Sequence, residues 1–565
     1  MNFERIIQLL GENTTNSLPL FSPELCIVGT IVALLLVRLF NADKHFPGSI
    51  VAIIGTVLAL GLAALQFKAF REGTLIDGHL VATLDTAPRL MFTGLLLYDP
   101  FTVYFRIFLL LFLLFVEWLT VVTGIPDAED APDFYVLLLG STLGMLLMAS
   151  ANHLLMVFLA IEMTSVPSYA MVGFLKGRRA SSEAALKYVV YGAGAAGVML
   201  YGISLIAGLL GTAQLTVDPG AHLPSIAQAL VEFGKHTGPE HAAAVRTLVV
   251  GILMVLVGVA FKLSLFPFHF WCPDAFEGAA AEVGGYLSVA SKGAAFALLV
   301  RFCLALVGAT RSGGAPLSEL FMNIGVALGV VAAVTATFGN LAAYTQSNIK
   351  RLLAYSTIAH AGYMLMAVAA MMVILNAPTA GALTPDARTA AAETCIHGLL
   401  YYLAVYFFMN LGAFAIVALV RNQTFSEQIA DYAGLARQAP VLAVCMLICL
   451  VSLIGIPPFG GFFAKLVVFY SVVEAANLNP VMWGVFVAGV INTVLSLFYY
   501  LRIVKYMFFS PLPEGARSVD IPVLSDAGWY VLFVSLPVFG LGIFVNWLSV
   551  LTHDVAEWLL YIPRV

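Results

Sequence analysis

Long apolar runs, separated by short polar segments, follow one another along nearly the whole chain. A helix that crosses a bilayer needs about 20 mostly apolar residues. By this measure the sequence predicts about fourteen membrane-spanning helices, at residues 24–40, 48–68, 95–123, 134–150, 153–175, 183–211, 245–271, 282–308, 317–339, 351–375, 395–420, 441–475, 480–509 and 528–551. The longest interruptions, such as 212–244 and 375–394, are too short for a separate soluble domain. We therefore expect an all-α polytopic membrane protein.

Two of the predicted helices contain strong helix breakers. Pro267 interrupts the seventh, and Pro457 with Pro458 interrupts the twelfth. Proline removes a backbone donor, and broken backbone at membrane depth is tolerated only where protein or water satisfies it. Broken helices in corresponding positions of two halves are typical of an inverted repeat and a transport path. The spacing predicts two inverted five-helix repeats, helices 4–8 and 9–13, and a division into residues 1–130 (helices 1–3), 131–310 (first repeat), 311–510 (second repeat) and 511–565 (helix 14).

Composition agrees with a lipid-facing surface. Hydrophobic residues make up 61% of the chain and charged residues 10%, whereas soluble proteins carry roughly 25% charged residues. The net charge of −5 and the lack of a basic arm give no indication of nucleic-acid binding. None of the 6 cysteines forms a CxxC motif, so we expect neither a disulfide framework nor an iron–sulfur site.

The orientation follows from basic residues in the short loops. The N-terminus lacks the features of a signal peptide, so the first apolar run is expected to be retained. Arg178 and Arg179, and then Lys350 and Arg351, lie in loops that share one side of the membrane. Because cytoplasmic loops are enriched in lysine and arginine, and the helix number is even, we expect both termini on the outer side.

Four ionisable residues lie inside apolar runs: Glu162, Lys262, Lys292 and Lys465. Each costs about 2.5–3.5 kcal/mol at mid-bilayer. Around Glu162, Lys262 and Lys292 the helices continue on both sides, so the charged groups cannot easily reach the headgroups. Desolvation disfavours a charged lysine, and a nearby carboxylate opposes this effect. We therefore interpret Lys262 as a switchable proton holder modulated by Glu162, the alternative being a structural ion pair.

Other polar residues in or near the apolar runs have more than one reading. His269 suits a proton relay, because imidazole titrates near neutrality, but a hydrogen-bonded histidine at a helix end is equally open. His360 is a further candidate site residue, although both it and His397 lean towards structural roles. Lys187 is either a loop-facing positive charge or the first step of a cytoplasmic proton path.

The remaining charges in the spans are expected to be structural. Arg106 and Glu117 lie 11 residues apart on nearly the same helical face, and we expect each to pair with a neighbouring helix. Arg502 and Lys505 lie near a helix end, where long basic side chains anchor by reaching the interface.

One motif suggests a nucleotide site but lacks the required context. Gly192–Gly197 spells GxGxxG, yet the dinucleotide fingerprint needs a preceding strand, and here the motif lies in the middle of an apolar helix. Small residues there favour close helix packing. No Walker loop or HExxH motif is present either. We therefore expect no site for NADH, flavin, metal or cluster in this chain, and any redox chemistry in partner subunits.

The residues from Gly258 to Lys292 resemble subunit N of the proton-pumping NADH–quinone oxidoreductases, the respiratory complex I family. The resemblance lies in Phe261–Ser264, Pro267–His269 and Ala290–Lys292. Four further runs also look like motifs of this family: Glu162–Tyr169, Glu183–Tyr188, Gln346–Ser356 and Gly455–Lys465.

This resemblance implies a membrane-arm subunit of fourteen helices with two inverted repeats, in the cell inner membrane. It implies that Glu162 and Lys262 match the modulating pair, Lys292 the central lysine and Lys465 the lysine of the second half. Proton translocation would be driven by electron transfer from NADH to quinone. The FMN and the iron–sulfur clusters for that transfer would be bound by other subunits. The implied partners are paralogous antiporter-like subunits, lipid and protons. The alternatives are a subunit of a multisubunit cation/proton antiporter or of a related membrane-bound hydrogenase.

Overall fold

The computed structural model describes residues 3–40, 44, 46–72, 89–127, 129–175, 177–216, 224–236, 238–311, 315–378, 384–512 and 517–561. Within them the chain is almost wholly helical. The first part comprises α1 (Phe3–Ser17), α2 (Ser22–Leu39), α3 (Gly48–Glu72), the hairpin β1 (Arg89–Met91) and β2 (Leu96–Tyr98), α4 (Pro100–Thr123), α5 (Ala131–Ser150), α6 (Leu154–Val172), α7 (Arg179–Leu210), α8 (Ile226–Phe233), α9 (Pro239–Leu263), α10 (Trp271–Gly278) and α11 (Ala281–Arg311).

The second part comprises α12 (Ala315–Ala343), α13 (Ile349–Asn376), α14 (Pro385–Thr424), the 3₁₀ helix η2 (Ile429–Tyr432), α15 (Leu435–Gln438), α16 (Pro440–Ile454), α17 (Gly460–Ala476), α18 (Val481–Phe509), α19 (Asp526–Ile543) and α20 (Val545–Tyr561). Among the described residues, thirteen helices are long and apolar enough to cross a membrane. The pair α16 and α17 supplies the remaining predicted span in two pieces, so the expectation of about fourteen spans is confirmed.

The structure differs from the predicted spans mainly at their ends. The span predicted from residue 95 begins at Pro100, because Leu96–Tyr98 forms strand β2 and Asp99 caps α4 by accepting a hydrogen bond from Thr102 N at 2.8 Å. The span predicted as 528–551 is two helices, α19 and α20, which meet at Phe544. The interruption 212–244 contains α8, while its residues 217–223, like 379–383, lie outside the described residues.

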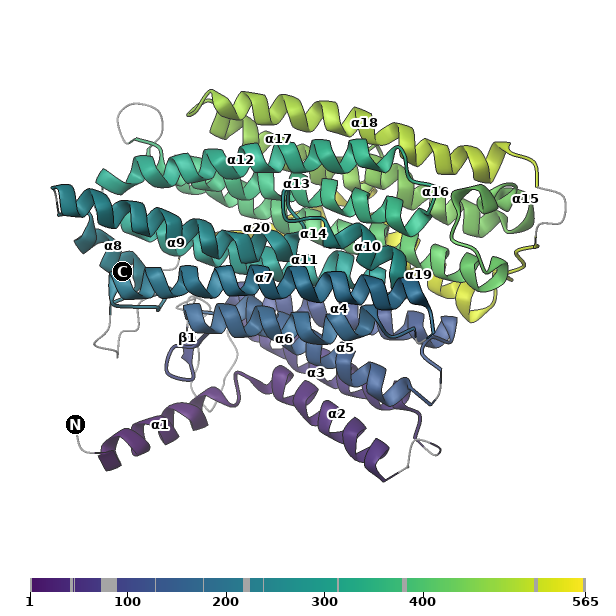
Figure 1. Ribbon diagram of the computed structural model, residues 1–565, viewed down its shortest axis with the longest axis horizontal. Coiled ribbons are helices and arrows are strands. Elements are labelled where there is room, and N and C mark those ends of the chain that lie inside the picture. The colour runs from purple at the N-terminus through teal and green to yellow at the C-terminus, as the bar shows by residue number, and fades with distance from the viewer. Residues whose placement is uncertain are drawn as a thin grey trace.

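Three long helices form the centre of the bundle. The spans of α11 and α13 are entirely buried inside the protein and that of α14 is 89% buried, whereas only 28% of the α2, α3 and α18 spans is buried. In Figure 1 the helices run side by side, with α2 and α3 at one edge and α18 at the other, and both chain ends lie towards the same end of the bundle. Lys292 and Arg301 on α11 and His360 on α13 are therefore buried inside the protein.

Both predicted helix breaks are present. Helix α9 ends at Leu263, where Ser264 has a left-handed backbone with φ of 58°, and the chain resumes a helix only at Trp271. Helix α16 ends at Ile454, Gly455 has φ of 89°, and α17 begins at Gly460. The prolines after each left-handed residue prevent the helix from continuing. The division into two inverted repeats, with its residue boundaries, stays a prediction.

Candidate functional site

The break after α9 positions Lys262, the penultimate residue of that helix. Its side chain is completely buried, and its Nζ donates a hydrogen bond to Ser165 Oγ of α6 at 3.1 Å. The ammonium group also lies in the last helical turn, where backbone carbonyls carry partial negative charge. A neutral hydroxyl and a helix end therefore hold this lysine in place.

Glu162 lies on α6, three residues before Ser165, and is half-buried. Its charge and that of Lys262 lie close enough to interact electrostatically. Across the described part of the chain, no ion pair within 4 Å joins the two groups, and the Lys262 ammonium donates to Ser165 instead. The carboxylate thus acts on the lysine from a distance and leaves its hydrogen bond undisturbed.

Lys292 lies at the centre of the buried helix α11. It is 1% exposed, and its Nζ donates a hydrogen bond to the backbone oxygen of Thr357 in α13 at 3.0 Å. Nearby, Ser264 and Ser291 each carry a buried hydroxyl that has no hydrogen-bond partner among the described residues. Such hydroxyls are the groups that ordered water satisfies in protein interiors. Lys292 is therefore placed between the α9 break and α13.

His360 lies one helical turn after Thr357 on α13. Its Nδ1 is 2.7 Å from the Tyr402 hydroxyl of α14, and its Nε2 is 3.3 Å from the Tyr500 hydroxyl of α18. The ring is buried and lies within electrostatic reach of both Lys292 and Lys465. A histidine with a polar group on each ring nitrogen can accept a proton at one and release it at the other.

The second break provides the partners of Lys465. Five residues separate the end of α16 from the start of α17, so the last carbonyls of α16 have no helical N–H to bind. Lys465 Nζ donates to two of them, Leu453 O at 3.2 Å and Ile454 O at 2.8 Å, and lies 4.5 Å from the centre of the Tyr363 ring. These contacts stabilise a cation without a carboxylate.

Together, Lys262, Lys292, His360 and Lys465 form what we call the buried charge row. Each side chain is 4% exposed or less. They come from α9, α11, α13 and α17. His360 lies within electrostatic reach of Lys292 and Lys465, whereas Lys262 lies near Glu162 and Ser165 of α6. Their hydrogen-bond partners are all neutral: backbone carbonyls for Lys292 and Lys465, a serine hydroxyl for Lys262 and tyrosine hydroxyls for His360.

His269 does not join the row. Its ring is buried, stacks on Phe266 and contacts Phe270 and Phe338. Neither ring nitrogen has a hydrogen-bond partner among the described residues. The histidine therefore sits in an aromatic cluster at the break, where no relay partner reaches it.

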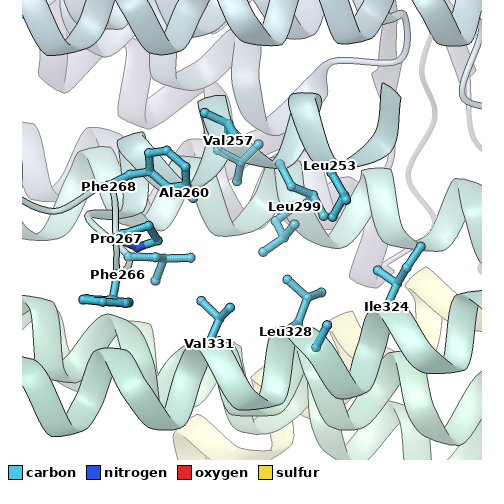
Figure 2. Close-up of a pocket in the computed structure, with 14 residues that line it drawn as sticks. Leu253, Val257, Ala260, Phe266, Pro267, Phe268, Leu299, Ile324, Leu328 and Val331 are labelled. Carbon is cyan, nitrogen blue, oxygen red and sulfur yellow. The ribbon is translucent and has the colours of Figure 1, made fainter. Parts of the chain in front are cut away.

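Another side of the break faces an apolar cavity of about 170 Å³ between α9, α11 and α12. Figure 2 shows Phe266, Pro267 and Phe268 of the break around the same space as Leu328 and Val331 of α12. Leu253 and Phe268 of its lining are exposed, so the cavity is an apolar pocket that opens to the surface of the protein. The polar contacts of Lys262 and the apolar wall thus lie on different sides of one broken helix.

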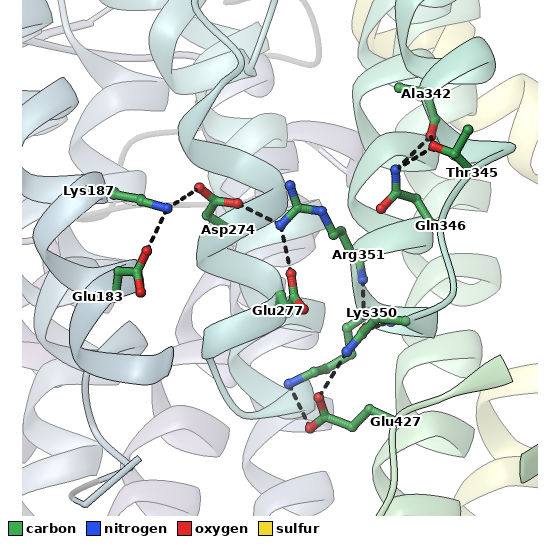
Figure 3. A network of polar contacts seen from close by, with 11 residues as sticks. Glu183, Lys187, Asp274, Glu277, Ala342, Thr345, Gln346, Lys350, Arg351 and Glu427 are labelled. Carbon is green, nitrogen blue, oxygen red and sulfur yellow. Dashed lines mark hydrogen bonds and ion pairs between the residues drawn. The ribbon is translucent and has the colours of Figure 1, made fainter. Parts of the chain in front are cut away.

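Lys187 belongs to a network of charges, which Figure 3 shows from close by. Its Nζ bridges Glu183 at 2.9 Å and Asp274 at 2.8 Å, and Asp274 also accepts from Arg351 at 2.6 Å. Burial opposes ionisation of Asp274, but the hydrogen bonds from Lys187 and Arg351 outweigh it and hold the pKa of the Asp274 carboxyl below its ordinary value. The network joins α7, α10 and α13, and Lys187 is half-exposed within it.

Sequence reasoning missed the burial of Lys350, which it assigned to a loop. Its side chain is completely buried, 2.8 Å from Glu427 and 2.6 Å from Ala279 O. It also missed the pair of Arg301 and Asp99, whose atoms approach to 2.7 Å. An arginine inside the eighth apolar run was the available signal for this pair, whereas nothing near Lys350 in the sequence points to its distant partners.

The structural charges agree in part with expectation. Arg106 pairs with Glu24 of α2 at 2.7 Å, as expected for a contact with a neighbouring helix. Glu117 accepts a hydrogen bond from Thr56 of α3 at 2.9 Å and has no cationic partner among the described residues. Arg502 donates to the backbone oxygens of Tyr344 and Gln346, so it fastens a loop of the protein and does not reach for headgroups.

The GxGxxG run serves helix packing at one position. A side chain at Gly192 would collide with the Tyr169 hydroxyl, 1.9 Å away, so glycine is needed for α7 to approach α6. Gly194 and Gly197 have nothing within 4 Å of an added methyl group. Helix α7 covers the whole run, which excludes the strand that a dinucleotide fingerprint requires.

Comparison with known proteins gives one consistent result. Residues 151–382 and 387–496 match the transmembrane family described as NADH:quinone oxidoreductase/Mrp antiporter. NADH-quinone oxidoreductase subunit N 2 of Chloroherpeton thalassium is 35% identical over 554 residues, covering 97% of this chain and 96% of that protein. Subunit N of an Anaeromyxobacter species is 36% identical over 551 residues, covering 95% of this chain and 96% of that protein.

Solved structures share the fold. A chain of respiratory complex I from Thermus thermophilus with bound aureothin superposes with a TM-score of 0.67 at 27% identity, over 93% of this chain and 98% of that one. A chain of the Mrp complex from a Dietzia species superposes with a TM-score of 0.73 at 18% identity, over 97% and 98%. At that identity the second likeness concerns the fold alone.

Proposed function

We infer the function from one premise: this chain belongs to the NADH:quinone oxidoreductase/Mrp antiporter family, and within it to subunit N of the NADH–quinone oxidoreductases. It is a membrane-arm subunit of respiratory complex I. What this premise leaves open is which residues translocate protons and how the broken helices take part.

We propose that the buried charge row carries protons across the subunit. The observation that supports this most strongly is the arrangement around His360, which lies between two buried lysines and has a tyrosine hydroxyl at each ring nitrogen. A proton leaving Lys292 would pass through the imidazole towards Lys465, and each group would return to its neutral form afterwards. Because no carboxylate contacts Lys292 or Lys465 within the described residues, their charge is not locked by an ion pair.

The broken helices supply the partners that make these lysines switchable. Lys465 donates to backbone carbonyls that are free to accept its hydrogen bonds only because α16 ends beside it. Lys262 is held by the end of α9 and by Ser165, with Glu162 as a nearby modulating charge. Movement at either break would change the stabilisation of one cation and shift its proton to the next group. Conformational change in neighbouring subunits is the source we propose for that movement.

We also infer that electron transfer takes place elsewhere in the complex. NADH, FMN, iron–sulfur clusters and quinone would be bound by partner subunits, and this chain would contact paralogous antiporter-like subunits and lipid through its exposed apolar helices. Residues such as Leu186, Val190 and Phe498 are at least 58% exposed on spanning helices, which suits such contacts. The cell inner membrane, with both termini on the outer side, is the proposed location.

The test is proton pumping by the assembled complex in proteoliposomes, with Lys292→Ala in this subunit. We expect NADH-driven proton uptake to fall at least roughly 10²-fold, because a positioned proton carrier typically contributes that much. Lys505→Ala is the matched control, since Lys505 is an exposed lysine on α18. Normal assembly together with full pumping by Lys292→Ala would rule out the buried charge row as the path.

A further inference from the structure

Glu117 is a buried acid that the buried charge row does not use. It lies on α4 with 0% exposure, and its Oε1 accepts a hydrogen bond from Thr56 Oγ1 at 2.9 Å. Its Oε2 has no partner, and no cation lies within 4 Å of the carboxyl among the described residues. Glu24, by contrast, contacts Arg106 at 2.7 Å. A buried carboxyl with no compensating cation holds a proton, because the bare charge is too costly there.

Tyrosine and threonine hydroxyls surround this acid. Thr120, one turn further along α4, is 2.8 Å from the Tyr135 hydroxyl of α5. Tyr135 and Tyr286 both lie within electrostatic reach of Glu117. The Tyr286 hydroxyl, from the central helix α11, is 2.8 Å from Thr142 Oγ1. The environment of Glu117 thus contains groups that can both accept and donate a proton.

Further pairs of buried hydroxyls lie between this region and Lys262. Ser141 lies next to Thr142 on α5, and its Oγ is 3.2 Å from Ser168 Oγ of α6. Ser165 lies one turn before Ser168 on α6, and it accepts the hydrogen bond from Lys262 at 3.1 Å. We call Tyr286, Thr142, Ser141, Ser168 and Ser165 the hydroxyl ladder. All five are 2% exposed or less, so water from outside does not interrupt them.

We propose that Glu117 is a proton-holding residue that exchanges a proton with Lys262 through the hydroxyl ladder; this inference rests on the proposed function. In the forward step the O–H bond of the Glu117 carboxylic acid breaks. Each hydroxyl of the ladder accepts one proton and passes on its own, and the neutral amine of Lys262 gains an N–H bond. Glu117 is left as a carboxylate, and a proton from water restores the acid.

The route for that restoring proton also has a candidate. Glu282 lies one turn before Tyr286 on α11, is 1% exposed and has an Oε2 without a partner among the described residues. It lies within electrostatic reach of Lys350, which belongs to the charged network of Figure 3. Glu282 is therefore a candidate link between the half-exposed part of that network and the interior where Glu117 lies.

A purely structural role for Glu117 makes a different prediction. If the carboxyl only joins α3 to α4 through Thr56, then glutamine does the same, because its amide oxygen also accepts a hydrogen bond and has nearly the same shape. Glu117→Gln would then leave both assembly and pumping intact. A proton-holding role, in contrast, is lost in the amide and partly kept in Glu117→Asp.

The experiment uses the complete complex carrying Glu117→Gln or Glu117→Asp. The control is Glu232→Gln, because Glu232 is an exposed acid of α8 that pairs with Lys235. Infrared difference spectra in H₂O and D₂O report the carbonyl of a protonated carboxylic acid. Proton uptake in proteoliposomes reports transport. We expect Glu117→Gln to lack one exchange-sensitive carbonyl band and to pump roughly 10²-fold more slowly, and Glu117→Asp to recover part of both.

Three other outcomes would each contradict the role of Glu117 or the proposed function. Full pumping by Glu117→Gln, with Lys262→Ala inactive, overturns the role of Glu117 and leaves the buried charge row standing. Full pumping by both variants overturns the proposed function and this inference with it. If Glu117→Gln does not assemble, Glu117→Asp carries the test, and an unchanged carbonyl spectrum in that variant overturns the proposal.

Discussion

Replacing Gly461 by alanine should damage transport while leaving most of the fold in place. Gly461 lies in the first turn of α17, and its N–H donates to Ser452 Oγ at 3.1 Å. A Cβ at this position would lie 1.9 Å from the Ser452 carbonyl oxygen, and real Cβ atoms do not come within 3.0 Å of such an atom. Because the obstacle is backbone, α16 and α17 must separate by about 1 Å.

That separation acts directly on Lys465, one turn further along α17. Its bonds to Leu453 O and Ile454 O span the same break, at 3.2 and 2.8 Å, and a shift of about 1 Å breaks at least one of them. A hydrogen bond from a charged group contributes about 1.5–3 kcal/mol, and each 1.4 kcal/mol is tenfold in rate or equilibrium. We therefore expect Gly461→Ala to slow proton pumping roughly tenfold or more.

The assay compares Gly461→Ala with Gly484→Ala, measuring NADH-driven proton uptake and thermal stability of the assembled complex. Gly484 lies on α18 with nothing within 4 Å of an added methyl group, so alanine there should be neutral or slightly stabilising. Overpacking at Gly461 should cost about 1–3 kcal/mol of stability. The reasoning is refuted if Gly461→Ala pumps like Gly484→Ala, because the end of α16 would then not control Lys465.

Three further predictions follow from single residues. Asp99→Ala leaves Arg301 as an unpaired buried charge and should destabilise the subunit by about 3–5 kcal/mol, much of which Arg301→Met should restore in the double variant; chemical denaturation of both variants checks this. Asp274→Asn should lower the melting temperature equally at about pH 5 and pH 8. Because the pKa of Asp274 is lowered from its ordinary value of 3.8, its ion pairs stabilise the protein at every pH above that value and are lost only in stronger acid. A melting temperature that did not differ between Asp274→Asn and the unmodified protein at pH 5 would contradict this. His269→Phe should keep proton uptake within about twofold, because the ring has aromatic neighbours and no polar partner in the described structure; strong loss of pumping would return His269 to the path.

The sequence predicted the spans, both breaks and the buried charges, for a shared physical reason. A lysine such as Lys292 inside an apolar run is costly wherever its partners lie, so its position alone is informative. Pro267 and Pro457 likewise end a helix whatever surrounds them. Features of this kind depend only on neighbours along the chain, which is why they can be read before the structure is known.

Features that depend on distant helices could not be predicted. His360 contacts Tyr402 of α14 and Tyr500 of α18, which are distant from it in the chain. Without knowledge of these partners, the sequence favours a structural role for this histidine. Lys350 looked like a loop residue because Glu427, its partner, is 77 positions away in the chain. For His269 the sequence left a relay and a structural role equally open, and the phenylalanine rings around it come from the break itself and from α12.

The apolar pocket beside the α9 break has a consequence for proton leakage. A path that carries protons across a membrane must be separated from water along its length. Otherwise protons flow back through any hydrated opening and the gradient is lost. Around Phe266 and Pro267 the broken backbone would be such an opening, but the walls of this pocket offer water no polar partner. An apolar lining at the point where the helix is interrupted would therefore oppose the leakage of protons from the proposed path.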